Sequence, residues 1–231
     1  MARFLDTPRW LIRRRFLTPG HLRTALRYLW VRLRHPEVEF EGYAFIGPGV
    51  RFEVRPGFGR LVIGRWTHLG ERVKLRAHEG VLRVGSKCVI GYDSTINCYL
   101  DIEVGDATIF GDRVYVCDFD HRTADVNLPI KDQGLVKSPV RIGADCWLGA
   151  GVTVVRGTDL GEGSVAAAHA VVRGTIPPRS ICAGVPARVV ANRSERYADA
   201  AAERTYIAAR GEQAAAEVRR LVAGEDADKA R

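Results

Sequence analysis

His121 closes a short acidic run, with Asp118 three residues and Asp120 one residue before it. Because imidazole titrates near neutral pH, a histidine in this position can act as a general base that takes a proton from an attacking group. Either carboxylate could hold the ring in a useful tautomer and orientation. The alternatives are a surface histidine in a flexible turn, and aspartates that occur there because Asp is common in turns.

His121 lies just outside a regular six-residue repeat. From residue 142 onward an aliphatic or small residue recurs at every sixth position, and a second series follows four residues behind the first. The two series are Ile142, Leu148, Val154, Leu160, Ala166 and Val172, and Cys146, Val152, Thr158, Ser164, Ala170 and Ile176. Periods of 2 and 3.6 do not produce this pattern, whereas three six-residue sides make one coil of a solenoid. The repeat therefore predicts a mainly β protein, a left-handed parallel β-helix whose stacked coils bury one aliphatic column.

Glycines and breaks mark the corners of this predicted β-helix. Gly143 and Gly149 directly follow inward residues, where a tight corner requires either a positive φ or a close approach of two backbones. The largest break, from Val116 to Ile142, spans 26 residues, so an extended loop over residues 122–140 must leave the coil. Lysines 131 and 137 in this loop would attract an anionic acceptor or acyl group, or would simply be solvated.

The positive charge is concentrated at the N-terminus. Residues 1–35 contain nine arginines and one acidic residue, whereas the remaining basic and acidic residues balance at 26 each. A basic tail on a neutral body indicates an electrostatic anchor and argues against a nucleic-acid-reading domain. We expect a basic arm of amphipathic helices at 1–40, the β-helix at 41–192, and a C-terminal helix and tail at 193–231.

The arm contains a predicted helix that begins near Thr18 and Pro19. Leucines 22, 26, 29 and 33 share one face of it, and arginines occupy other positions. Three interpretations remain open. The leucines pack against the β-helix, or the arm binds an anionic membrane face with Trp10, Phe16 and Trp30, or it binds an anionic polysaccharide or partner protein.

The cysteines and the hydropathy pattern exclude several classes of protein. Five cysteines with no C-x-x-C pair argue against a disulfide framework and a zinc site, and suggest buried thiols in a reducing cytoplasm. No apolar run is long enough for a membrane span or a signal peptide. We expect a cytoplasmic protein, peripheral at the inner face of the plasma membrane if the arm binds lipid.

Two segments resemble a known family. The stretches Val140–Val154 and Ile176–Val189, the latter running from Ile-Pro-Pro to Ala-Gly-Val-Pro-Ala-Arg, are similar to the hexapeptide acyltransferases of the maltose, galactoside and nodulation acetyltransferase group. The resemblance covers about residues 60–192. It implies a homotrimer with active sites between adjacent β-helices, and acyl-CoA lying along the C-terminal coils. His121 stands where that family has its catalytic base, although Phe119 replaces the first residue of the family's His-Asp-His.

The resemblance also implies binding residues. Asn97 matches an acceptor-binding asparagine, or is a member of an inward asparagine ladder. Trp147 is expected on the outer surface, either as a platform for pantetheine or as part of the trimer packing. The remaining implied donor-binding residues are Gly149, Ala150 and Ala168 through their backbones, Arg173 and Arg188 for the CoA phosphates, and Pro178 for adenine or as a structural stop.

The expected activity is transfer of an acetyl or succinyl group from acyl-CoA to a hydroxyl of a sugar or polysaccharide. His121 would be the general base in a ternary complex, with no tightly bound cofactor and no metal. N-acyl transfer to an amino sugar is one alternative, and a non-catalytic β-helix scaffold is another. A zinc hydratase of the same fold needs three histidines around the metal, whereas His68, His78, His121 and His169 are scattered in the sequence.

Overall fold

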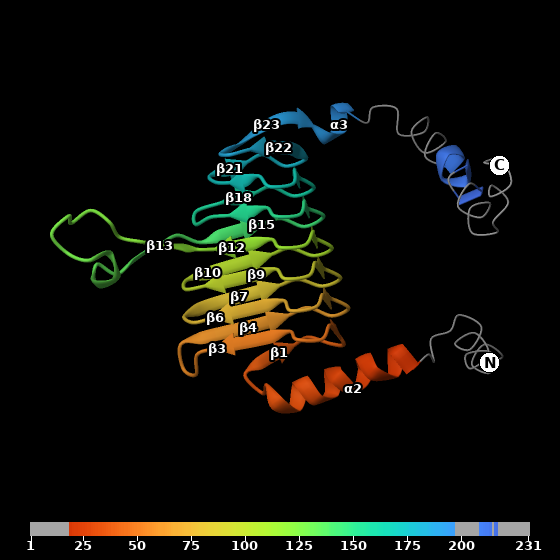
Figure 1. Cartoon of the computed structure of the whole chain (residues 1–231), viewed down its shortest axis with the longest axis horizontal. Coiled ribbons are helices and arrows are strands. Elements are labelled where there is room, and N and C mark those ends of the chain that lie inside the picture. The colour runs from red at the N-terminus through yellow and green to blue at the C-terminus, as the bar shows by residue number, and fades with distance from the viewer. Residues whose placement is uncertain (1–18, 197–207, 214, 217–231) are drawn as a thin grey trace, which may run out of the picture. The chain divides into compact units, whose positions relative to one another are not determined.

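The computed structural model describes residues 19–196, 208–213 and 215–216. The chain divides into one unit that ends at Ala191 and a second that begins at Asn192. In the first unit, three sheets form the three walls of a solenoid, and every coil runs from wall A to wall B to wall C (Figure 1). Adjacent coils pair in parallel, which confirms the predicted left-handed parallel β-helix.

Most strands are short, as corners every six residues require. Wall A contains β1 (Val38–Phe40), β4 (Gly59–Ile63), β7 (Gly80–Val84), β10 (Asp101–Val104), β15 (Val140–Ile142), β18 (Asp159–Leu160) and β21 (Thr175–Ile176). Wall B contains β2 (Phe45–Ile46), β5 (His68–Leu69), β8 (Val89–Ile90), β11 (Ile109–Phe110), β16 (Trp147–Leu148), β19 (Val165–Ala166), β22 (Ser180–Gly184) and β23 (Ala187–Asn192). Wall C contains β3 (Arg51–Val54), β6 (Lys74–Ala77), β9 (Thr95–Cys98), β12 (Tyr115–Cys117), β17 (Thr153–Val154) and β20 (Val171–Val172).

The inward positions of the repeat form the core. All twelve residues of the two predicted series are buried, and most of them are completely inaccessible to solvent. Stacking the coils removes these aliphatic side chains from water, which no single coil could do alone. The five cysteines are free and buried, as predicted, and four of them, Cys88, Cys98, Cys146 and Cys182, belong to the hydrophobic core.

Close backbone packing explains the glycines that follow inward residues. A Cβ on Gly143 would lie 2.5 Å from the backbone nitrogen of Glu162, and one on Gly149 would lie 2.6 Å from that of Ala168. Positive φ occurs two residues later in each corner, at Asp145 and Gly151. Of the two predicted reasons for these glycines, close approach is therefore the one that applies.

Helix α2 (Pro19–Arg34) covers the first coil. Tyr28 and Val31 are buried against the coil, the Tyr28 hydroxyl donates to the Gly42 carbonyl at 2.9 Å, and Arg27 donates to the Ile46 carbonyl at 2.8 Å. The predicted helix is confirmed, but the interpretation that its leucines pack against the β-helix is wrong. All four leucines are exposed, because the aromatic side chains of the first coil accept Tyr28 and Val31 from the opposite face.

The predicted loop is a hairpin that projects from the corner between walls C and A (Figure 1). Strands β13 (Phe119–His121) and β14 (Leu135–Lys137) pair antiparallel, and the short 3-10 helix η1 (Ile130–Asp132) lies between them. The chain thus leaves the coil after Asp118 and rejoins it at Val140. The base of the extension is a two-stranded arm, and His121 is the last residue of its first strand.

The terminal predictions are described only in part. In the second unit, α3 (Arg193–Arg196) and residues 208–213 and 215–216 are helical. Residues 1–18, with Trp10 and Phe16 of the basic arm, and most of the predicted C-terminal helix lie outside the described residues. No helix in the described part of the chain is both long enough and apolar enough to cross a membrane.

Candidate active site

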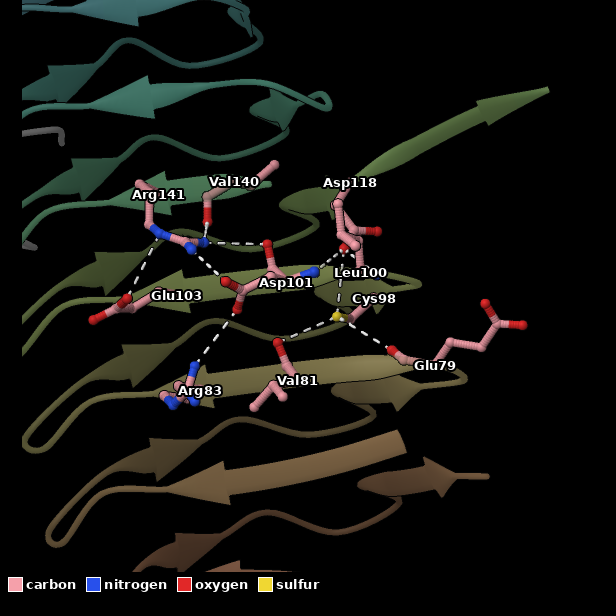
Figure 2. A network of polar contacts seen from close by, with 10 residues as sticks. All are labelled: Glu79, Val81, Arg83, Cys98, Leu100, Asp101, Glu103, Asp118, Val140 and Arg141. Atoms are coloured by element: carbon pink, nitrogen blue, oxygen red, sulfur yellow. Dashed lines mark hydrogen bonds and ion pairs between the residues drawn. The ribbon is translucent and has the colours of Figure 1, made fainter. Parts of the chain in front are cut away.

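The three walls differ in the chemistry of their outer faces. Wall A presents charged residues in register, among them Arg83, Glu103, Arg141 and Asp159. Arg141 pairs with Asp101 and lies 3.7 Å from Glu103, while Arg83 lies 3.5 Å from Asp101 (Figure 2). These side chains are partly exposed, and alternating charge is typical of a solvent-facing surface. Wall A is therefore poorly suited to bind an apolar partner.

Wall B instead carries an apolar column. Its outward positions are in register from coil to coil, and Val89, Ile109 and Trp147 among them are exposed. The full column is Phe45, His68, Val89, Ile109, Trp147, Val165 and Ile181. Trp147 is 54% exposed, so its predicted place on the outer surface is confirmed.

His121 lies at the end of β13, exposed on the hairpin at the CA corner, which is the corner between walls C and A. Its cross-strand partner in the hairpin is Leu135. The preceding Asp120 accepts a hydrogen bond from Nε of Arg156 at 2.5 Å. Arg156 belongs to the same corner of the next coil, between β17 and β18. This contact fixes the hairpin against the body of the solenoid and was not predicted from the sequence.

Asp118 does not contact His121, so its predicted role of orienting the ring is wrong. Its side chain is completely buried and accepts hydrogen bonds from the backbone N–H groups of Tyr99, Leu100 and Asp101 at 2.7–2.8 Å. Figure 2 shows Asp118 beside Leu100 and Asp101. The Cys98 thiol adds a fourth contact at 3.4 Å. A carboxylate surrounded by backbone donors ties one corner to the corner of the next coil. Asp118 therefore supports the base of the hairpin.

An aromatic stack lies at the CA corner below the hairpin. The His78 and Tyr99 ring centroids are 4.9 Å apart, and those of Tyr99 and Phe119 are 4.5 Å apart. Phe119 thus fills the place of the family's first histidine with a packing contact. The amine of Lys137 lies 5.6 Å from the centre of the Tyr99 ring and forms an ion pair with Glu79. The six-residue repeat does not predict the stack, because His78, Tyr99 and Phe119 lie 21 and 20 residues apart, which are not multiples of six.

The loop lysines are already neutralised. Lys137 pairs with Glu79, and Lys131 lies 2.7 Å from Asp132. The two interpretations were that these lysines attract an anionic ligand or that they are simply solvated. Because both lysines already form ion pairs, the structure does not support the first.

Asn97 faces outward on wall C, beside the CA corner. It is in register with Arg76 and Cys117 on the neighbouring coils. Its side-chain oxygen is buried and has no hydrogen-bond partner among the described residues. Burial raises the pKa of the neighbouring Tyr115 phenol, and a hydrogen bond with Asn97 opposes that shift. A buried acceptor left without a donor is unfavourable, and in the described chain this oxygen is closed to solvent.

The residues predicted to bind a donor occupy several corners. Gly149, Ala150 and Ala168 meet at the BC corner of adjacent coils, and His169 N–H donates to the Ala150 carbonyl at 2.9 Å. The N–H groups of Ala150 and Ala168 have no acceptor within the described residues, whereas those of the flanking Gly149 and Gly151 donate to Ala166 and Asp112 at 2.8 Å. Both groups can therefore bind a ligand carbonyl.

The other predicted donor residues lie apart from that corner. Arg173 is exposed at the CA corner, one coil beyond Arg156. Pro178 is exposed at the AB corner, and Arg188 lies on β23, where its guanidinium donates to the Ala187 carbonyl at 2.9 Å. Within the described residues, no group of His, Cys, Asp and Glu side chains could hold a metal ion.

Comparison with known proteins identifies the chemistry. Residues 139–172 match the family model described as hexapeptide repeat of succinyl-transferase. Over 210 residues the chain is 49% identical to the probable acetyltransferase Rv3034c of Mycobacterium tuberculosis, covering 90% of this chain and 70% of that protein. The chain belongs to the hexapeptide-repeat acyltransferases. The resemblance noted in the sequence and the prediction of an acyltransferase are thereby confirmed.

Two further proteins are similar to this hexapeptide acyltransferase, one over part of its sequence and one in its fold. It is 36% identical over 96 residues to the putative lipopolysaccharide biosynthesis O-acetyl transferase WbbJ of Escherichia coli, covering 38% of this chain and about half (49%) of that relative. It also shares its fold with AntD, an N-acyltransferase from Bacillus cereus solved in complex with dTDP and 3-hydroxybutyryl-CoA. For that pair the TM-score is 0.61 at 18% identity, covering 77% of this chain and 95% of AntD.

Proposed function

We propose that this hexapeptide acyltransferase transfers an acetyl or succinyl group from acyl-CoA to a hydroxyl of a sugar or polysaccharide, with His121 as the general base. The observation that carries this proposal is the presentation of His121. It is exposed at the end of a short antiparallel arm whose Asp120 is held by Arg156. An exposed imidazole on a fixed support can reach the proton of a hydroxyl held in front of it.

The proposed reaction is a direct displacement in a ternary complex. The acceptor oxygen attacks the thioester carbonyl while His121 takes its proton, and the C–S bond then breaks to release CoA, whose thiolate recovers that proton. Negative charge develops on the carbonyl oxygen during attack, and a backbone N–H aimed at it lowers the barrier. The free N–H of Ala150 is our candidate for this donor.

The separation of His121 from Trp147 supports the proposal of a homotrimer. His121 projects from the CA corner, whereas Trp147 stands on wall B, which is the wall opposite that corner. One chain therefore cannot bring both residues to one substrate. A neighbouring copy that offers its apolar wall B and BC corner to this chain's CA corner would unite them, and would also cover the column around Ile109.

The donor proposal assigns roles to the residues around these corners. Ala150 and Ala168 of one chain would bind the pantetheine amides, with Gly149 leaving room for the backbone and Trp147 beside them. Arg173 and Arg188 would pair with the phosphates of CoA, and Pro178 would contact adenine. The binding of 3-hydroxybutyryl-CoA by AntD, which shares the fold, supports a CoA thioester as donor.

A carbohydrate acceptor is supported by the relatives and by Asn97. WbbJ is described as an O-acetyl transferase, which favours a hydroxyl, while AntD is an N-acyltransferase, which makes an amino sugar the second candidate. The side-chain oxygen of Asn97 is buried and has no partner among the described residues, and it would accept a hydrogen bond from a hydroxyl or an amine once the acceptor reaches it. We place the reaction in the cytoplasm, because five free buried thiols suit a reducing compartment.

One experiment tests both donor and acceptor. The purified protein is incubated with acetyl-CoA or succinyl-CoA and candidate glycans, and the products are identified by mass spectrometry. We expect a mass increase of one acyl group, and a turnover at least roughly a hundredfold lower for His121→Ala. Near-normal turnover by His121→Ala would remove His121 from the mechanism.

A matched control and a binding measurement complete the test. His35→Ala removes another partly exposed histidine far from the hairpin in sequence, and should leave turnover within about twofold of the parent. Calorimetric titration with both acyl-CoAs separates an enzyme from a scaffold. Absence of binding to either thioester, together with absence of product, would favour the non-catalytic scaffold.

A further inference from the structure

The outer face of α2 is an apolar surface on the described part of the chain. Its members are Leu22 at 63% exposure, Leu26 at 57%, Leu29 at 55%, Trp30 at 60% and Leu33 at 84%. Since the helix is anchored through Tyr28 and Val31 on its opposite side, these side chains cannot turn inward without breaking that packing. The apolar face is therefore a fixed outward feature of the fold.

Arginines border this apolar face on both sides. At 100° per residue the four leucines fall within about 60° of one another, with Arg23 and Arg34 roughly 90° to one side and Arg32 roughly 90° to the other. The helix contains four arginines and no acidic residue. Arg27, the fourth, points towards the coil and donates to the Ile46 carbonyl. The surface is thus an apolar stripe between two positive edges.

A groove continues the stripe towards the first coil. It has a volume of about 380 Å³, with Leu26 and Trp30 on its α2 side and Ile46 and Val50 on its coil side. Arg27 also lines it. The surface therefore offers an apolar recess beside a guanidinium as well as a convex stripe.

We propose that α2 docks this protein on an anionic lipid bilayer, with the leucines and Trp30 in the interfacial region and Arg23, Arg32 and Arg34 against the lipid phosphates. The charge pattern carries this choice, because long basic side chains beside an apolar stripe can reach headgroups while their neighbours enter the acyl boundary. A helix of this length is about 24 Å long and lies in the plane of the interface. The inference does not depend on acyl transfer.

A second copy of the chain is a less suitable occupant of this surface. Two identical faces brought together would oppose arginine edges with the same charge, which is unfavourable. An acidic protein would satisfy the charge equally well, and the experiment below separates it from a bilayer.

The test is sedimentation of the full chain with vesicles of phosphatidylcholine containing 30% phosphatidylglycerol, and with pure phosphatidylcholine as the neutral comparison. We expect binding to the anionic vesicles that weakens as salt increases. Leu26→Ser, Leu29→Ser and Leu33→Ser together should weaken it by roughly a hundredfold or more. Arg32→Gln with Arg34→Gln should weaken it about thirtyfold.

Two matched variants control for general loss of charge and of apolar surface. Arg60→Gln with Arg65→Gln removes the same charge from exposed positions outside α2, and Phe58→Ser removes an exposed apolar side chain from the turn between β3 and β4. Both should bind vesicles like the parent, and circular dichroism should show that all variants are folded. No binding to anionic vesicles, or equal binding by the leucine variant, overturns the proposal. Retention on immobilised polyglutamate without vesicle binding overturns it in favour of an acidic protein partner.

Discussion

Nε of Arg156 donates a hydrogen bond to Oδ2 of Asp120 at 2.5 Å, and this contact connects the residue beside His121 to the next coil of the solenoid. An exposed ion pair contributes at most about 1 kcal/mol to stability, so its main effect is to fix the direction of the hairpin. Arg156 is in this sense a positioning residue. In the proposed mechanism it would act on His121 through Asp120, without contacting the substrate.

Arg156→Ala should therefore lower kcat roughly tenfold while leaving KM for the acyl donor close to that of the parent. The melting temperature should shift by less than about 3 °C. Arg156→Lys should recover part of the activity. Arg72→Ala, which breaks the exposed Arg72–Asp93 pair of two other coils, is the control and should keep full turnover. Equal losses of activity in both variants would argue that Arg156 has only a structural role.

Asp118→Ala should destabilise the fold strongly. The change removes a completely buried side chain and leaves three partly buried backbone N–H groups of residues 99–101 without their acceptor. The expected loss is about 3 kcal/mol, or a melting temperature roughly 6–12 °C lower. Asp106→Asn, at an exposed carboxylate that accepts one N–H from Ser86, should shift it by only about 2 °C or less. Similar shifts for the two variants would contradict the role of Asp118 as a buried support.

Because of its buried thiols, the folded protein should become less stable as the pH rises above about 8.5. Burial raises the pKa of Cys88 to about 11, and burial together with the Asp118 carboxylate raises that of Cys98 to about 12. Since an unfolded thiol titrates near pH 8.5, these two groups stabilise the fold fully below that pH and progressively lose the contribution as the pH rises towards 11 or 12. The melting temperature measured from pH 8 to 11 should therefore decline.

The double variant Cys88→Ala, Cys98→Ala isolates the thiol contribution. Its melting temperature should decline less steeply with pH than that of the parent, whatever its value at pH 8. An identical slope in the two proteins would assign the alkaline loss to other groups, such as Tyr43 and Tyr115, whose pKa values burial also raises.

Ile109→Arg tests the proposed role of wall B in assembly. Ile109 is exposed in the middle of the apolar column, so the substitution should leave the single chain folded while placing a charge in the interface. Sedimentation velocity should show trimers of the parent and monomers of the variant, with turnover lost in parallel. Thr175→Arg on charged wall A should remain trimeric and active. A trimeric Ile109→Arg protein would place the subunit contact on another wall.

The coil pattern and the core could be predicted from the sequence, and so could the existence of α2. A six-residue period determines which side chains point inward, because each repeat forms one side of a coil. Whether a side chain in the repeat points inward or outward therefore depends only on its position in that repeat. The sequence also predicted that Gly143 and Gly149 lie at corners. Only the stacked backbones showed that these positions require glycine because two backbones approach closely, and not because φ is positive. The resemblance to the family was carried by the stretches Val140–Val154 and Ile176–Val189, and the 49% identity over 210 residues to an acetyltransferase established membership.

The tertiary structure decided what depends on neighbouring coils. Asp118 and Asp120 are two positions apart in the chain, but the hairpin begins between them. Asp118 is therefore buried and accepts hydrogen bonds from backbone N–H groups, whereas Asp120 is exposed and pairs with Arg156. The leucines of α2 formed the obvious apolar stripe in the sequence, but the first coil accepted Tyr28 and Val31 from the opposite face. A single sequence contains the periodicity of each element, whereas the face that is buried depends on the shape of the surface that receives it.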